Sequence, residues 1–173
     1  MTALATPIRS DARASPTRHE LTSSSRSTAA PIVAAVDGSA ASRAAVETAV
    51  RLGAEMDAPV VFVYVRRGPA GFLGKPVYQR RLTTAMRRAR RVLDRPVQAA
   101  TLAGVAAEGE ILEGLPHNRI LEFARARGAR LVVVGRRRRK LGRSVWCGVV
   151  RAARRPVVVA QNLDGMPAAA KAA

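Results

Sequence analysis

Short apolar runs alternate with longer amphipathic runs along most of the chain. The apolar runs are nearly continuous, rich in valine and bounded by glycine, proline or charged residues, which is typical of parallel strands covered on both faces. They predict strands at residues 31–36, 60–65, 131–134 and 156–160. A more polar run predicts one further strand at 106–112.

Between these runs, apolar residues recur at helical spacing and predict four helices. The helices are expected at residues 40–56, 77–93, 119–127 and 143–153. Ser39 is the expected N-cap of the first helix and Asn118 of the third, because both side chains can accept a hydrogen bond from a free backbone N–H. Pro96 is expected to end or kink the second helix, although residues 98–102 could continue it.

The order of these elements predicts the fold class. Strand–helix–strand units join parallel strands through right-handed crossovers. We therefore expect an α/β protein with a doubly wound five-stranded parallel sheet, in a Rossmann-like three-layer sandwich. In such sheets, ligands bind beyond the carboxyl ends of the strands, where the strand order reverses. The positions of interest are residues 37–39, residues 64–66 and the loop after Gly135.

The chain has 173 residues, 48% of them hydrophobic, which suits one domain with its own core. We expect that domain at residues 31–162, between a disordered N-terminal arm (1–30) and a flexible C-terminal tail (163–173). No apolar run approaches the roughly 20 residues of a membrane helix, and no signal-peptide core follows the first residue. The sequence therefore predicts a cytoplasmic protein that does not insert into a membrane.

Positive charge is the most unusual property of the composition. The chain has 30 lysines and arginines against 12 acidic residues, a formal net charge of +18. The charge gathers on the polar face of the second predicted helix and on a basic loop at residues 136–143. Either cluster could be a solvated surface, or could bind the phosphates of a nucleotide, a nucleic-acid backbone or an acidic protein or membrane surface. Aromatic residues make up only 3% of the chain, which argues against base stacking and sequence-specific reading.

Residues suited to catalysis or to metal binding are few. Cys147 is the only cysteine, and His19 and His117 are the only histidines, so no disulfide and no Cys/His or Ser/His/Asp set can be assigned. Glu108 and Glu110 are expected on one face of their strand, as solvated carboxylates. We expect no catalytic residue, no metal site and no enzyme activity, with only weak ATP hydrolysis left open.

Two segments together resemble the universal stress protein family. Residues 32–39, Ile-Val-Ala-Ala-Val-Asp-Gly-Ser, resemble its first strand and turn. Residues 128–135, Gly-Ala-Arg-Leu-Val-Val-Val-Gly, resemble part of its last third, together with the Arg-Pro-Val-Val-Val strand at 155–159. The resemblance runs from about Pro31 to Gln161 and matches only in layout over residues 70–112. It implies the adenine-nucleotide alpha-hydrolase-like form of the sandwich, and a homodimer that often forms through the last strand, here 156–160.

Many members of this family bind ATP, and the resemblance implies where a nucleotide would lie in this chain. The turn of Val36, Asp37, Gly38 and Ser39 would lie near adenine and ribose, and the backbone of Val65 would contact adenine. Asp37 could equally be a plain turn residue, and Val65 the last core residue of its strand. Mg²⁺ is expected only if ATP binds.

The family's phosphate loop has the form Gly-x2-Gly-x9-Gly-Ser/Thr, whose glycines let backbone N–H groups approach phosphate. Gly135 and Gly148 match this form at the right spacing, whereas Arg138 replaces the second glycine and Val149 replaces the hydroxyl residue. Arg138 could bind a phosphate through its guanidinium or block the approach. Val149 removes a hydrogen bond worth on the order of 1 kcal/mol.

Two functions therefore stay open at this point. The first is a cytoplasmic regulatory protein of the stress response that binds ATP or another adenine nucleotide at the Asp37 and Gly135 strand ends. The alternative is a non-nucleotide member whose basic loop 136–143 docks an acidic protein, nucleic acid or another anionic surface. Equilibrium dialysis with ATP separates them, and the double change Arg138→Gly with Val149→Ser would create binding only under the alternative.

Overall fold

The structure is a computed structural model, and it describes residues 29–66, 75–136 and 144–161. Most of the expected arm, the tail 163–173 and most of the basic loop lie outside these residues. The strands are β1 (Ile32–Ala35), β2 (Val60–Arg66), β3 (Ala107–Glu113), β4 (Leu131–Gly135) and β5 (Val157–Ala160). The helices are α1 (Ala40–Glu55), α2 (Lys75–Leu102), α3 (Pro116–Ala126) and α4 (Val145–Ala152). The predicted alternation of strands and helices is confirmed.

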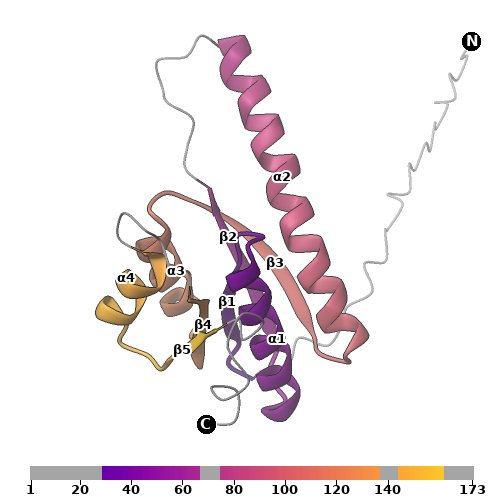
Figure 1. The fold of residues 1–173 in the computed structure, drawn as a ribbon, viewed down its shortest axis with the longest axis vertical. Helices are drawn as coiled ribbons and strands as arrows, with labels where there is room; N and C mark the ends of the chain where they lie inside the picture. Colours follow the sequence, from indigo (N-terminus) through magenta and orange to yellow (C-terminus); the bar gives the residue numbers. More distant parts are fainter. Residues whose placement is uncertain (1–28, 67–74, 137–143, 162–173) are drawn as a thin grey trace, which may run out of the picture.

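The strands form one parallel sheet in the order β3-β2-β1-β4-β5. The chain builds outward from β1 to β2 and β3, then crosses back to place β4 and β5 on the other side of β1 (Figure 1). The strand order therefore reverses between β1 and β4, where Ala35 pairs in register with Val134. This pattern confirms the doubly wound sheet, and it makes the carboxyl ends of β1 and β4 the switch point.

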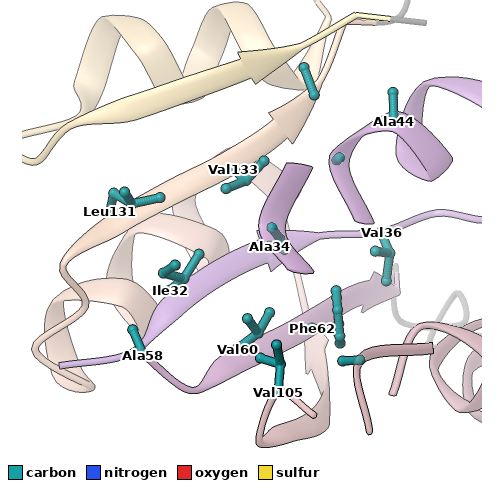
Figure 2. Packing of buried hydrophobic residues seen from close by; sticks show 14 of the residues in the cluster. Ile32, Ala34, Val36, Ala44, Ala58, Val60, Phe62, Val105, Leu131 and Val133 are labelled. Atoms are coloured by element: carbon teal, nitrogen blue, oxygen red, sulfur yellow. The ribbon is translucent and has the colours of Figure 1, made fainter. Parts of the chain in front are cut away.

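Helices cover both faces of the sheet and give the expected three layers (Figure 1). On one face, α1 and α2 pack on a core that includes Ile32, Val60 and Phe62 (Figure 2). On the other face, α3 and α4 pack on a core that includes Val33 and Val63. Neighbouring residues of one strand thus serve opposite cores, which explains why the strands are apolar without alternation.

The starts of two helices test the capping predictions. Ser39 caps α1 as expected, and its side chain accepts a hydrogen bond from the backbone N–H of Ser42 at 3.2 Å. The expected cap of α3 at Asn118 is wrong, because that helix begins at Pro116 with Leu115 in the N-cap position and no side-chain cap. A proline in the first turn lacks an N–H that would need a partner, and its ring already holds a helical φ.

Helix α2 does not end at Pro96 but continues to Leu102, so of the alternatives left open by the sequence the continuation through residues 98–102 is confirmed. Leu93 and Ala100, on either side of Pro96, are buried against the sheet, and this packing holds the helix together across the missing hydrogen bond. At 28 residues α2 is about 42 Å long, against about 23 Å for β2. Its N-terminal part therefore extends beyond the carboxyl ends of the strands (Figure 1).

Candidate functional site

The turn between β1 and α1 lies at the switch point and is held by three hydrogen bonds. The Asp37 carboxylate accepts a bond from the N–H of Ser39 at 2.9 Å, and the N–H of Gly38 donates to the hydroxyl of Ser42 at 3.2 Å. Gly38 has a φ of +80°, which a glycine adopts without strain. Asp37 is thus a turn residue, as its plain interpretation expected, and it is also exposed just beyond the carboxyl end of β1.

The side chains of the two valines expected near adenine, Val36 and Val65, pack against the core. Val36 is 4% exposed, packs with the α1 and α2 layer, and donates its N–H to the carbonyl of Val63 at 2.9 Å. Val65 is half-buried and packs against the core on the α3 and α4 face. A contact from Val36 to a ligand would therefore come from its backbone, as the family resemblance implies for Val65.

Gly135 ends β4 where the first turn of α1 crosses it. A Cβ atom on this residue would lie 2.1 Å from the carbonyl oxygen of Ala41 and 2.4 Å from its carbon. Only glycine fits there, whether or not a phosphate binds nearby. This close approach also holds the end of β4 beside the helix that begins with the Asp37 turn, so the structure brings these two predicted positions together.

Gly148 and Val149 lie within α4. The N–H of Gly148 donates to the carbonyl of Ser144 at 3.3 Å, and a Cβ atom on Gly148 would lie 2.9 Å from the Cβ and Cγ of His117. Val149 is fully buried in the core between the sheet and its helices. Both residues therefore have packing roles. Because Arg138 lies outside the described residues, the phosphate loop stays a prediction.

Arg136 begins the basic loop and is the part of it that the structure describes. Its backbone N–H donates to the carbonyl of Ala160 at 2.7 Å, and its Nη1 donates to the side chain of Gln161 at 3.1 Å. Its guanidinium carbon lies 5.7 Å from the centre of the Trp146 ring, a cation–π distance. The loop therefore leaves the sheet from an arginine anchored to β5 and α4.

A pocket of about 600 Å³ lies between the carboxyl end of β2 and the overhanging part of α2. We call it the arginine pocket. Its lining residues are Tyr64, Val65, Arg66, Arg80, Arg81, Thr84, Ala85 and Arg88. The sequence indicated the strand end and the basic helix face separately but did not predict that they line one pocket. The sequence feature that points to this pocket is the excess of positive charge over residues 66–95, which contain ten basic residues and one acidic residue.

The three glutamates of β3 pair with arginine. Glu108 and Glu110 share one face of β3, as expected, and both form ion pairs with Arg127 at the end of α3.

Within residues 29–66, 75–136 and 144–161, no three histidine, cysteine or acidic side chains lie close enough to hold a metal ion. None of the helices in these ranges is both long and apolar enough to cross a membrane.

Comparison with known proteins places this fold among solved structures. A protein from the universal stress protein family of Burkholderia pseudomallei is 32% identical over 74% of this chain and 93% of its own, with a TM-score of 0.59. The universal stress protein of Archaeoglobus fulgidus in complex with dAMP is 23% identical over 76% and 98% of the two chains, with a TM-score of 0.60. A family protein of Arabidopsis thaliana with AMP bound is 18% identical over 81% and 97%, with a TM-score of 0.60.

No curated protein sequence matches this chain. The family model described as "Universal stress protein family" matches residues 29–161, which include every described strand and helix. The chain belongs to the universal stress protein family.

Proposed function

We propose that this protein binds an adenine nucleotide at the switch point between β1 and β4 and acts, without catalysis, as a cytoplasmic regulatory protein of the stress response. The proposal depends most on one observation: Asp37 is exposed on a fixed turn at the carboxyl end of β1, beside the end of β4 at Gly135. Ligands of open α/β sheets bind at this crevice. The structures with bound dAMP and AMP support the same ligand class.

The surroundings of the turn suit a nucleotide. A carboxylate at Asp37 can accept hydrogen bonds from ribose hydroxyls. The first turn of α1 contains no acidic residue, so no carboxylate within the helix offsets the positive end of its dipole. The phosphates would extend toward the loop after Gly135, where Arg138 supplies a guanidinium in place of a glycine. Mg²⁺ would enter only with the phosphates of ATP.

Isothermal titration with ATP, ADP and AMP, with and without Mg²⁺, tests this proposal. We expect saturable binding below millimolar concentration, and at least a tenfold loss of affinity in Asp37→Ala. Asp94→Ala is the matched control, because it removes the same charge from an exposed position on α2. Absence of saturable binding at millimolar nucleotide, or equal losses in both variants, would refute the proposal.

We also propose that the protein forms a homodimer through β5. This strand pairs only with β4 among the described strands, and its Val157, Val158 and Val159 are half-exposed. An edge strand of this kind can pair with a second copy. Light scattering after gel filtration should give twice the chain mass of 18.4 kDa, and Val157→Lys should give the single mass with an unchanged circular dichroism spectrum. A monomer at tens of micromolar wild-type chain would contradict this.

A second candidate function is non-specific binding of a nucleic-acid backbone. It is favoured by the arginines of α2, none of which forms an ion pair with a described residue. Such binding would weaken steeply with salt. Fluorescence anisotropy with a short DNA duplex should show binding at ~50 mM salt and a large loss at ~200 mM. No binding at the lower salt concentration would remove this candidate.

A further inference from the structure

We propose that the arginine pocket is a second ligand site, adjacent to the switch point, that binds a small anion with several closely spaced phosphates. Inorganic tripolyphosphate is the simplest ligand of this kind. The pocket has about 600 Å³, within the range of small-molecule sites, and four of its eight lining residues are arginines. The pocket shares Val65 with the proposed nucleotide site, but neither Asp37 nor Gly135 lines it.

The charge of the pocket is largely uncompensated. Arg66 forms an ion pair with Glu113, its neighbour across the β2–β3 register. Within the described residues, Arg80, Arg81 and Arg88 form no ion pair. The four arginines line one open pocket, so their charges repel one another where they approach, and an anion bound between them relieves this repulsion.

Arg66 provides an independent observation that points to a ligand. Its side chain is only 14% exposed, and one of its two terminal nitrogens, Nη2, contacts Glu113. The other, Nη1, is buried and has no hydrogen-bond partner among the described residues. A buried donor without a partner costs stability, so such atoms are rare in native proteins. Because Nη1 has no exposed surface, it reaches a phosphate oxygen only when the Arg66 side chain turns toward the pocket that it lines.

The arrangement of α2 favours several phosphates over one. Arg80, Thr84 and Arg88 follow one another at four-residue spacing and therefore share one face of the helix. The Cα atoms of Arg80 and Arg88 are about 12 Å apart along the axis, so an anion with several phosphates spans more of this distance than a single phosphate does. The Thr84 hydroxyl donates to the carbonyl of Arg80, so the donors left for a ligand are the guanidinium groups and the Tyr64 hydroxyl. Planar guanidinium groups bind pairs of phosphate oxygens.

Isothermal titration of the full chain with tripolyphosphate at ~150 mM salt, where exposed charges are screened beyond about 8 Å, tests the proposal. The pocket variant is Arg80→Gln with Arg88→Gln. The matched control is Arg87→Gln with Arg91→Gln, which removes the same charge from exposed residues of the same helix that do not line the pocket. We expect at least a tenfold loss of affinity in the pocket variant and less than a twofold change in the control.

Three results would overturn the inference. They are the absence of saturable tripolyphosphate binding, equal losses in the two double variants, and orthophosphate affinity within threefold of tripolyphosphate affinity. Asp37→Ala separates this site from the proposed nucleotide site, because it should leave tripolyphosphate affinity unchanged while it weakens AMP binding. Loss of tripolyphosphate binding in Asp37→Ala would mean that the pocket is not a distinct site. Absence of AMP binding alone would refute only the nucleotide proposal.

Discussion

Gly135 belongs to a phosphate-loop pattern, but it also lies against the backbone of α1. Replacing it by alanine tests whether glycine is needed there for packing or for binding a ligand. The new Cβ atom would lie 2.1 Å from the carbonyl oxygen of Ala41, whereas ordinary contact begins at 3.4 Å, so it would be 1.3 Å too close. The obstacle is the backbone of the first turn of α1, which cannot rotate away as a side chain can. The helix must therefore shift relative to β4.

The magnitude follows from the site. Overpacking a core costs about 1–3 kcal/mol where side chains can yield, and a clash with backbone places this variant at the upper end, about 3 kcal/mol. For a chain of this size each kcal/mol lowers the melting temperature by about 2–4 °C. We therefore expect Gly135→Ala to melt about 6–12 °C below the wild type, with no nucleotide present.

Thermal denaturation followed by circular dichroism measures this effect, and Gly104→Ala is the control. Gly104 has a φ of +74°, and a Cβ atom there would have no neighbour within 4 Å, so alanine brings backbone strain of about 1–2 kcal/mol without a clash. Equal melting temperatures for Gly135→Ala and the wild type would refute the packing explanation. A stable Gly135→Ala protein that no longer binds nucleotide would show instead that this glycine serves the ligand.

Three further substitutions test the structure at other points. Ser39→Ala should cost about 1 kcal/mol in urea denaturation, because it removes the cap bond to the N–H of Ser42, and an unchanged midpoint would contradict this role. Val149→Ser restores the hydroxyl of the family pattern but places it in a fully buried position. The free energy of unfolding should therefore fall by about 2–3 kcal/mol in the same assay. Stability equal to that of the wild type would show that the position is not buried. Arg127→Gln should cost less than about 1 kcal/mol, since its ion pair with Glu108 is largely exposed, and a loss of several kcal/mol would mean that this pair is structural.

Helix α2 contributes both to the core and to the surface of the arginine pocket. Its second half carries Leu93 and Ala100 into the core, whereas the part that extends beyond β2 carries Arg80 and Arg88 to the arginine pocket. The overhanging part lies N-terminal to Leu93, and Pro96 lies on the other side of Leu93. The net charge of +18 is thus partly placed at a defined concave surface and not spread evenly over the protein.

The local pattern of residues was sufficient to predict the elements and their order. Continuous valine runs occur where strands are covered on both faces, and the Asp37-Gly38-Ser39 turn has the side-chain acceptors and the glycine that such a turn needs. The boundaries of helices were less certain from sequence. Local preferences of a few kcal/mol or less left the end of α2 open at Pro96 and wrongly favoured Asn118 as a cap, because packing on the sheet continues α2 and Pro116 starts α3.

Features that require contact between segments far apart in the sequence were determined only by the tertiary structure. The strand order, and with it the switch point between β1 and β4, follows from the crossover that no local pattern encodes. The need for glycine at 135 comes from a backbone contact with Ala41, 94 residues earlier in the chain. The pocket forms because a helix longer than its strand places Arg80 and Arg88 beside Arg66. The sequence alone determined the chemistry of these side chains. Only the packing of α2 on the sheet determined that they line the arginine pocket.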